Sequence, residues 1–365
     1  MNPANGQLLI NLSFMGLKPT GLTTYAANLI PSLAVSQATL LASCHHHFAD
    51  SQREFSYYTI PENLTSEYGS KGHLRRLLWT QFQLPRLYQK LRSPLLFSPI
   101  PEAPLFSNCR FVVMVHDLIP LHFSAWKSPL KYYFQYYVPL VLKQATHIIC
   151  NSQATAQDMV DFYNIPAKKI TSILLAHDAN HFQFLDLPTQ NYFIYIGRSD
   201  PYKNLQRSLQ AFARLPQQQY EFLIVGSLDP RYTPGLKILV DELGITSQVR
   251  FLDYVPYADL PTLINQAIAL VFPSLWEGFG LPVLEAMACG TPVITSNLAS
   301  MPEVAGEAAI LVDPYNEAEI ANAMQAIATD GQMRSHLRQA GLARASQFSW
   351  TKTATQTAQV LQAYF

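Results

Sequence analysis

The most informative stretch of the sequence is Pro273-Ser-Leu-Trp-Glu-Gly-Phe-Gly-Leu-Pro-Val-Leu-Glu-Ala-Met-Ala-Cys-Gly-Thr-Pro-Val-Ile-Thr-Ser296. An apolar run that predicts a buried strand ends at Phe272, and the glycine-rich turn 277–280 follows it. Pro282 suits the first turn of a helix, where its missing N–H is not needed, and Gly290 suits the position just past the helix end. The stretch therefore predicts a strand, a glycine loop and a helix start. Free amides and the positive helix end in such a loop favour an anion such as a diphosphate.

Two carboxylates frame this loop. Glu277 precedes the predicted helix, and Glu285 lies about one turn inside it. Gly278 and Gly280 allow the backbone to approach a ligand closely. One carboxylate can face a sugar while the other faces a ribose, because carboxylates accept paired hydrogen bonds from vicinal hydroxyls.

The whole run resembles the E-x7-E signature region of the family 4 retaining glycosyltransferases. Both glutamates, the G-F-G, the L-P and the E-A-M-A-C-G-T-P-V run are present. An ordinary β-turn-α unit is the alternative, although the full pattern is far more restrictive than a bare glycine motif. The resemblance implies that Glu277 binds donor-sugar hydroxyls and Glu285 the ribose. It also implies that amides near Phe279 and Leu281 contact sugar and phosphate.

A second motif, residues 195–205, reads Y-I-G-R-S-D-P-Y-K-N-L. A predicted strand ends at Gly197, and Asn204 opens a helix. Arg198 and Lys203 thus follow the end of a strand, where ligands bind in open α/β sheets. Two cations there would neutralise a diphosphate leaving group. The motif is similar to the family's Gly-Arg…Lys-Asn element; a pair of solvated surface cations is the alternative.

A histidine and an aspartate follow a predicted strand of the first half, residues 111–115. His116 is placed to hydrogen-bond the donor sugar or the reacting centre, and Asp117 to orient His116 or receive the acceptor. The resembling H-D element of the family lies in the active cleft. A histidine satisfied by backbone at a strand end is the alternative.

Gly21 precedes a helix that we expect to begin near Thr23 or Thr24. Many family members carry G-I-G-R-Y here, whereas this chain has the two threonines in place of the second glycine and the arginine. The loop at Gly21 is expected to approach donor phosphate or acceptor. A plain N-capped helix is the alternative.

Short apolar runs alternate with helical stretches along the whole chain. Many runs are continuously apolar, as in strands covered by helices on both faces, and the repeated β-α-β order predicts parallel, doubly wound sheets. The expected strands are 8–12, 55–59, 111–115, 147–150, 170–174, 192–196, 222–225, 249–252, 269–272, 292–295 and 309–312. Helices are expected at, among others, 205–214, 236–243 and 317–329.

The β-α-β order occurs twice, with an aperiodic break at residues 176–189 that we interpret as a linker. The repeated order therefore predicts two α/β domains with parallel sheets. The resemblance implies that the fold is of the GT-B type, with two Rossmann-like domains facing across a cleft. Residues 1–180 would bind the acceptor and 190–347 the nucleotide sugar. The final segment, 348–365, would pack back on the first domain, as the resemblance implies.

Composition excludes several classes of protein. The 365 residues are 49% hydrophobic and 14% charged with a net charge of zero, which is typical of a well-buried globular protein rather than a disordered or nucleic-acid-binding one. Residues 1–185 carry 14 Lys/Arg against 9 Asp/Glu, whereas 186–365 carry 11 against 16. No apolar run approaches the roughly 18 residues of a membrane helix. Four cysteines without C-x-x-C spacing and no leader predict a cytoplasmic protein with reduced thiols.

Two further segments have compositions that can indicate membrane or metal binding. Residues 71–92 carry six cations and no acid, interleaved with apolar residues. Such a face docks on anionic lipid, as would suit peripheral contact at the inner membrane face and a lipid-linked acceptor; a surface helix packed on the core is the alternative. The run from Cys44 to His47 does not predict a metal site, because adjacent residues do not converge easily on one ion.

The resemblance implies a retaining glycosyltransferase that moves a hexose from a nucleotide sugar to a glycan or lipid-linked acceptor, with no cofactor and no metal. The stretches V-H-D-L-I-P and L-W-T-Q-F-Q-L-P look like the mannosyltransferase-like branch, which points to GDP-mannose; a UDP-hexose such as UDP-glucose is the second candidate. His116, Asp117, Glu277, Arg198 and Lys203 would carry the reaction. A sugar-nucleotide epimerase, a phosphorylase of the same fold and a non-catalytic binding protein remain as other classes.

Overall fold

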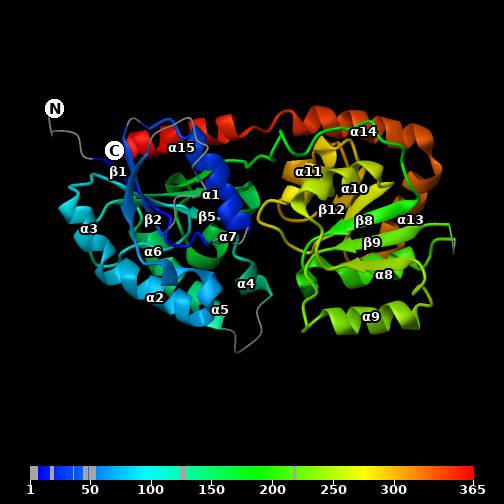
Figure 1. Ribbon diagram of the computed structural model, residues 1–365, viewed down its shortest axis with the longest axis horizontal. Helices are drawn as coiled ribbons and strands as arrows, with labels where there is room; N and C mark the ends of the chain where they lie inside the picture. Colours follow the sequence, from blue (N-terminus) through cyan, green and yellow to red (C-terminus); the bar gives the residue numbers. More distant parts are fainter. Residues whose placement is uncertain are drawn as a thin grey trace. The chain divides into compact units, whose positions relative to one another are not determined.

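The computed structural model describes residues 7–16, 20–35, 37–43, 48, 55–123, 129–216 and 219–365. The chain divides into two compact units (Figure 1). Unit 1 comprises Met1–Leu175 and Trp350–Phe365, and unit 2 comprises Ala176–Ser349. Each unit is built on its own parallel sheet.

The sheet of unit 1 has the strand order β3-β2-β1-β4-β5-β6-β7. Its strands are β1 (Leu8–Asn11), β2 (Ala38–Ala42), β3 (Ser56–Thr59), β4 (Leu96–Ser98), β5 (Phe111–Val115), β6 (His147–Cys150) and β7 (Ile170–Ser172). Its helices are α1 (Gly21–Ser32), α2 (Gly69–Phe82), α3 (Leu84–Lys90), α4 (Ile119–His122), α5 (Pro129–Tyr132), α6 (Val138–Gln144), α7 (Gln153–Tyr163) and α15 (Trp350–Tyr364), with a π-helical turn, η4 (Tyr133–Tyr137), between α5 and α6. Every described pairing of these strands is parallel.

Two of these strands, β2 and β4, were not expected from the sequence. Strand β4 is three residues long and lies among prolines and serines, which by themselves indicate a loop. It becomes a strand because Leu96 is paired between Leu9 of β1 and Phe111 of β5. Tertiary pairing therefore overrides the local pattern at this strand.

The last helix, α15, belongs to unit 1. It packs on α1. The hydroxyl of Thr353 donates a hydrogen bond of 2.7 Å to the carbonyl of Leu174, and the hydroxyl of Tyr364 lies 2.9 Å from Nδ1 of His147. The buried face of α15, which includes Ala354 and Leu361, completes the core of this unit.

The sheet of unit 2 has the order β10-β9-β8-β11-β12-β13. Its strands are β8 (Tyr192–Ile196), β9 (Glu221–Val225), β10 (Val249–Leu252), β11 (Ala269–Phe272), β12 (Val293–Ser296) and β13 (Ile310–Val312). Its helices are α8 (Leu205–Phe212), α9 (Thr233–Glu242), α10 (Leu260–Gln266), α11 (Leu281–Ala288), α12 (Met301–Ala305), α13 (Glu317–Thr329) and α14 (Gly331–Ala345), and a short 3-10 turn, η6, spans Pro201–Lys203.

Helices cover both faces of this sheet, with α10 and α11 on one face and α8 and α9 on the other (Figure 1). Helix α13 packs on α8, and α14 packs on α11. The strands are therefore enclosed on both sides, and all four residues of β11 are fully buried. This arrangement explains why they are continuously apolar.

Residues 176–189, which the sequence presents as an aperiodic break, pack on unit 2. Phe182 is buried, and the ring of His181 stacks on that of Tyr257 with centroids 3.7 Å apart. The backbone N–H of Leu185 donates to Oδ1 of Asn265 at 2.7 Å. The segment is thus held by side chains far along the sequence, which its local pattern does not reveal.

The strand order places a topological switch point in each unit. In unit 2 the chain builds outward from β8 through β9 to β10 and then returns to pair β11 on the other side of β8. In unit 1 the switch point lies between β1 and β4. In open α/β sheets, ligands bind beyond the carboxyl ends of the strands at this point.

Candidate active site

In the loop after β11, Gly280 has a backbone conformation that only glycine adopts without strain. Gly280 adopts a φ of 107° as the N-cap of α11. A Cβ at this position would meet Cε of Met301 at 2.3 Å, closer than any real Cβ contact. Pro282 lies in the first turn of α11, and Gly290, at φ 70°, follows its end. The predicted strand, glycine loop and helix start are therefore all present.

A buried serine holds this loop in shape. The hydroxyl of Ser300 lies 2.9 Å from each of the carbonyl oxygens of Glu277 and Phe279. Ser300 itself is fully buried. The fixed carbonyls leave the turn from Gly278 to Leu281 with a defined course, as a preorganised anion site requires.

Glu277 and Lys203 meet at the switch point of unit 2. Nζ of Lys203 donates a hydrogen bond of 2.6 Å to Oε1 of Glu277, and the two side chains are only 14% and 9% exposed. Lys203 follows β8 and Glu277 follows β11, the neighbouring strands that define the switch point. The second motif of the sequence is thereby joined to the first.

Lys203 of this pair is charged at neutral pH. Burial by itself would lower the pKa of Lys203, but the adjacent Glu277 and Tyr202 outweigh it, so the pKa lies above that of an ordinary lysine. Lys203 therefore remains a cation beside the glycine loop. A cation and free helix-start amides at one place favour a phosphate group.

Asn204 ties the two motif loops together. It has a left-handed backbone, with φ 60° and ψ 29°. Its side-chain amide donates to the carbonyls of Pro273 at 2.9 Å and Pro314 at 2.7 Å. The start of α8 is therefore fixed against the beginning of the glycine loop.

Arg198 lies at the same sheet edge but not in the Lys203–Glu277 pair. Its side chain is 64% exposed, and its Nε lies 2.8 Å from Oδ2 of Asp200. The hydroxyl of Tyr195 donates to the backbone carbonyl of Arg198 at 2.7 Å, which fixes the backbone at this residue. Arg198 can thus approach a ligand from the solvent side.

Gly197 ends β8 where two backbones come very close. Its N–H donates to the carbonyl of Val225 at 2.9 Å. A Cβ on Gly226, the residue after β9, would lie 2.0 Å from the carbonyl oxygen of Gly197. The carboxyl ends of β8 and β9 therefore form a tight backbone surface at the edge of the site.

Glu285 lies one turn into α11 and has an altered acidity. Burial raises the pKa of Glu285 to about 7, and the nearby Asp178 adds to this increase. Its carboxyl group is therefore partly protonated at neutral pH and can donate as well as accept a hydrogen bond. Glu285 also interacts electrostatically with Tyr257, whose pKa is raised by burial and by the charges of Asp178 and Glu285.

In unit 1, His116 directly follows β5 and is held by backbone. Its Nε2 lies 2.9 Å from the carbonyl oxygen of Pro99, and its ring meets Tyr25 edge to face with centroids 4.8 Å apart. Burial lowers the pKa of His116 to about 4, and the bond to Pro99 opposes this only in part. The imidazole is therefore neutral, with Nε2 as the donor to the carbonyl and Nδ1 as an acceptor.

His116 and Asp117 line a cavity of about 660 Å³ within unit 1. Most of the other lining residues are apolar or aromatic, among them Leu22, Leu77 and Phe134. Such a cavity, largely apolar with a few polar groups, is typical of a ligand site. Oδ1 of Asp117 accepts a hydrogen bond from the N–H of Ile119, so this carboxylate also shapes its own loop.

Helix α1 begins at Gly21, not near Thr23 or Thr24 as expected. Thr20 is the N-cap, and Thr20 and Thr23 form a reciprocal capping box. Thr20 and Thr23 stabilise a helix that starts at Gly21, because each side chain accepts a hydrogen bond from the backbone N–H of the other. Gly21 is exposed, and a Cβ there would meet nothing within 4 Å.

The basic segment 71–92 forms two helices, α2 and α3, and one of its cations is internal. Arg76 is buried and makes a two-point ion pair with Glu102, at 2.7 and 2.8 Å. Arg76 is therefore not part of a basic surface, because it neutralises a buried carboxylate from the loop after β4. The outer side of α2 instead exposes Leu74, Leu78 and Phe82.

Within the described ranges, no cluster of three or more His, Cys, Asp or Glu residues suits a metal ion. The run Cys44 to His47 lies outside the described residues. Among the described helices, none is long and apolar enough to cross a bilayer.

Two family models match the chain side by side. Residues 177–344 match the glycosyl transferases group 1, and residues 19–180 match glycosyltransferase family 4. Together they span both units and include every motif described above. The chain belongs to the family 4 glycosyltransferases.

Several curated relatives of this family 4 glycosyltransferase carry mannosyltransferase names, and others are named D-inositol 3-phosphate glycosyltransferase. It is 36% identical over 231 residues to O-antigen chain mannosyltransferase B of Escherichia coli, a match that covers 59% of this chain and 60% of the relative. It is 29% identical to O-antigen chain mannosyltransferase RfbU of Salmonella typhimurium, covering 85% of this chain and 88% of the relative. The match thus spans less than two thirds of the first relative and most of the second.

The fold is that of the GT-B glycosyltransferases. HepE from Anabaena, solved in complex with UDP and glucose, superposes with a TM-score of 0.76 at 20% identity, over 98% of this chain and all of that one. The likeness extends to both units and concerns the fold.

Sequence reasoning missed three structural contributors to this family 4 site: Ser300, Asn204 as a link between loops, and Asp178 beside Glu285. Ser300 and Asp178 stand in stretches without a motif. The sequence presents Asn204 only as the start of a helix, and no local signal indicates that its amide reaches Pro314, 110 residues away.

Proposed function

We propose that this glycosyltransferase moves mannose from GDP-mannose to a glycan or lipid-linked acceptor with retention of the anomeric configuration. The observation that carries the proposal is the buried Lys203–Glu277 pair beside the glycine loop of α11, at the switch point of unit 2. The mannosyltransferase names of the two relatives support mannose as the sugar.

In this proposal the diphosphate of the donor lies over the start of α11. The amides near Phe279 and Leu281 and the ammonium of Lys203 bind its oxygens, and Arg198 closes on it from the solvent side. Glu277 is then positioned, through its bond to Lys203, to accept hydrogen bonds from the sugar hydroxyls. Glu285 accepts from the ribose hydroxyls.

We further propose front-face displacement as the reaction. The bond between C1 of the hexose and the phosphate oxygen breaks, and a bond from C1 to the acceptor oxygen forms on the same face. The acceptor proton passes to the departing diphosphate. Lys203, Arg198 and the helix start stabilise the negative charge that grows on that leaving group.

The acceptor is proposed to bind in unit 1, in the cavity beside His116 and Asp117. Its largely apolar lining suits the carrier end of a lipid-linked acceptor better than a free sugar. The exposed Leu74, Leu78 and Phe82 of α2, flanked by Lys71 and Arg75, support contact of this unit with the anionic inner face of a membrane.

A UDP-hexose such as UDP-glucose is the second candidate donor, because the similar HepE structure holds UDP and glucose. An epimerase would act on the same donor without an acceptor, and a non-catalytic protein would bind it unchanged. The fate of the sugar separates these classes, because only a transferase moves it to an acceptor.

The experiment is a transfer assay with GDP-[14C]mannose and, in parallel, UDP-[14C]glucose, using lipid-linked oligosaccharide extracted from cells as acceptor. We expect label from GDP-mannose in the lipid fraction, in an α-linkage, and no loss of rate after treatment with a chelator. Label transferred only from UDP-glucose would replace the donor assignment. A changed but untransferred sugar would indicate an epimerase, and no reaction with either donor would contradict the proposal.

A further inference from the structure

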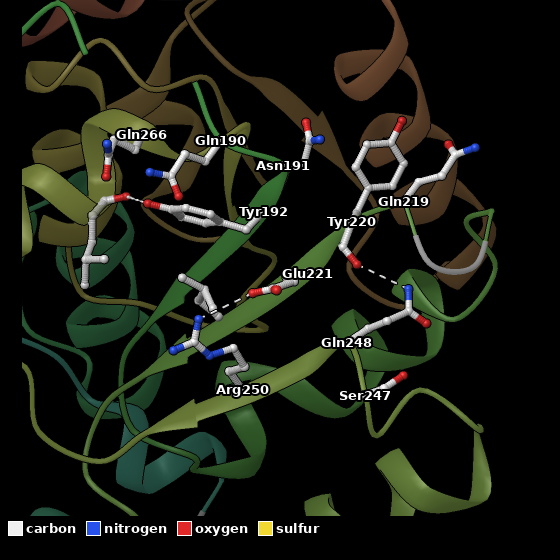
Figure 2. A pocket seen from close by; sticks show the side chains of 12 residues that line it. Gln190, Asn191, Tyr192, Gln219, Tyr220, Glu221, Ser247, Gln248, Arg250 and Gln266 are labelled. Carbon is white, nitrogen blue, oxygen red and sulfur yellow. Dashed lines mark hydrogen bonds and ion pairs between the residues drawn. The ribbon is translucent and has the colours of Figure 1, made fainter. Parts of the chain in front are cut away.

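A pocket of about 600 Å³ lies at the edge of the unit 2 sheet opposite the candidate active site. It is lined by the amino ends of β8, β9 and β10, where Tyr192 and Glu221 are the first residues of their strands (Figure 2). Tyr192 and Ile196 mark the two ends of β8, so roughly 13 Å of strand separates the pocket from the donor loops. A ligand in this pocket is therefore distinct from the nucleotide sugar.

The lining is rich in neutral amides. Five side-chain amides surround the pocket (Figure 2): Gln190, Asn191, Gln219, Gln248 and Gln266. Among the described residues that line it, the charged side chains are Glu221 and Arg250, which lie 3.5 Å apart and neutralise each other. The pocket therefore has no net charge to attract a nucleotide or another polyanion, unlike the site at Lys203.

Part of this lining is fixed and part is available. The hydroxyl of Tyr192 donates to the carbonyl of Leu263 at 2.7 Å, and the amide of Gln248 donates to the carbonyl of Tyr220 at 3.2 Å. These two hydrogen bonds hold both side chains in place against the pocket wall. Gln190, Asn191 and Gln219 are exposed, and their side-chain amides hydrogen-bond to none of the described residues.

We propose that this pocket binds a neutral oligosaccharide, a segment of the glycan chain that lies away from the reacting end. Each amide offers a donor and an acceptor together, which matches the adjacent hydroxyls of a sugar ring. The half-buried ring of Tyr220, braced edge to face against Phe193 with centroids 5.9 Å apart, offers an apolar face for the C–H side of a sugar.

The claim that the bound oligosaccharide belongs to the acceptor glycan rests on the proposed function. The claim that the pocket binds a neutral oligosaccharide does not. A transferase that holds the far part of its acceptor keeps that chain at high local concentration. Occupation of the pocket would therefore favour long acceptors over short ones, while leaving the chemistry at the donor loops unchanged.

The test is calorimetric titration of the full chain with neutral manno- and gluco-oligosaccharides of about two to six residues. Two variants address the pocket: Ser247→Trp fills it from an exposed loop position, and the double variant Gln190→Ala/Gln219→Ala removes two exposed amides. Gln339→Ala on α14, an exposed glutamine outside the pocket, is the matched control.

We expect one or both oligosaccharide series to bind, with affinity that rises with length. Both pocket variants should weaken binding about tenfold or more, a loss of about 1.4 kcal/mol, with unchanged melting temperature and unchanged GDP and UDP binding. The control should bind as the original chain does. Should Ser247→Trp fail to fold, the double variant carries the test alone.

Equal affinity in the pocket variants would place the sugar elsewhere and overturn the inference, as would no binding of either series. The proposed function fails separately. A chain that binds oligosaccharide through this pocket but transfers no hexose would contradict the transferase assignment and leave the pocket assignment intact.

Discussion

The ammonium of Lys203 lies 2.6 Å from the carboxylate of Glu277, and this contact joins the loop after β8 to the loop after β11. The two residues are 74 positions apart in the sequence. Both are nearly buried, so their charges are little screened by water. The pair therefore both holds the switch point together and presents a cation beside the glycine loop.

Replacing the lysine should harm stability and activity together. Lys203→Ala leaves Glu277 as a buried, unpaired carboxylate, which we expect to lower the free energy of unfolding by about 3 kcal/mol. It also removes a cation from the leaving group, which should reduce kcat/KM about 100- to 1,000-fold. Denaturant unfolding and the transfer assay measure the two effects.

The chain offers a matched control for this variant. Arg214 and Glu317 form an ion pair of 2.8 Å, but these side chains are 51% and 29% exposed. Arg214→Ala should cost less than about 1 kcal/mol because water screens the pair. If the two alanine variants were equally stable and equally active, the Lys203–Glu277 pair would have neither role.

Glu285 should make stability depend on pH. The pKa of Glu285 is raised by burial to about 7 in the folded chain, whereas an unfolded glutamate has a pKa of about 4.3. The folded state thus binds more protons between these values, and its stability falls as pH rises from about 4 to about 7. Partial exposure of the side chain limits this loss to on the order of 2 kcal/mol.

Glu285→Gln should remove this dependence. We expect the variant to match the original chain near pH 4.5 and to be more stable near pH 8, as measured by denaturant unfolding at each pH. Its affinity for nucleotide should fall near pH 8, where the ionised Glu285 is proposed to accept both ribose hydrogen bonds and the amide accepts only one, and should fall little near pH 5. Glu307→Gln, at an exposed position, is the control. Parallel stability profiles for Glu285→Gln and the original chain would contradict the assigned pKa.

Gly280→Ala should disrupt the donor loop. An alanine is strained at φ 107°, and its Cβ would press on the buried Met301. We expect a loss of about 1–3 kcal/mol in stability and of most nucleotide binding. Gly235→Ala, in the open face of α9, should instead stabilise the chain by about 0.5–1 kcal/mol. Nucleotide binding that survives Gly280→Ala unchanged would exclude the loop from the site.

His116 should act as a neutral group. Because burial lowers the pKa of His116 to about 4, its ring resonances should not shift between about pH 8 and pH 5.5 in an NMR titration. His116→Ala, which removes the bond to Pro99, identifies the resonance. A midpoint near pH 6.5 for His116 would contradict the neutral assignment and suggest a cationic role at the sugar.

The outer face of α2 should mediate membrane contact. The triple variant Leu74→Ser/Leu78→Ser/Phe82→Ser removes three exposed apolar side chains. We expect it to reduce co-sedimentation with vesicles of about one-third anionic lipid several-fold, without a change in melting temperature. Ile238→Ser on α9, also exposed, is the matched control. Equal sedimentation of the triple variant and the control would exclude this face.

The sequence was sufficient for the pattern of elements but not for the contacts between them. Strands such as β5 and β11 are apolar along their whole length, because helices cover both faces, and their bounds agree with the prediction. Strand β4 was missed because pairing with β1 and β5, not its own residues, makes it a strand.

The same distinction holds in the site. The glycine loop follows from local rules for helix starts and ends, and so it was predictable. The pairing of Arg76 with Glu102, by contrast, depends on how α2 packs over the loop after β4, and in sequence Arg76 looks like one more surface cation. Long-range partners of this kind carry no signal in a single sequence.

We infer that the loops joined by Lys203 and Glu277 bind a nucleotide sugar. The most direct measurement is thermal unfolding of the original chain and of Lys203→Ala with GDP, UDP, ADP and their sugar conjugates. At a hundred-fold excess over the dissociation constant, a ligand adds about 2.7 kcal/mol to stability. We predict a selective shift with GDP-mannose in the original chain and little shift in the variant. A folded chain that no nucleotide stabilises, or a variant that shifts as the original chain does, would contradict the account.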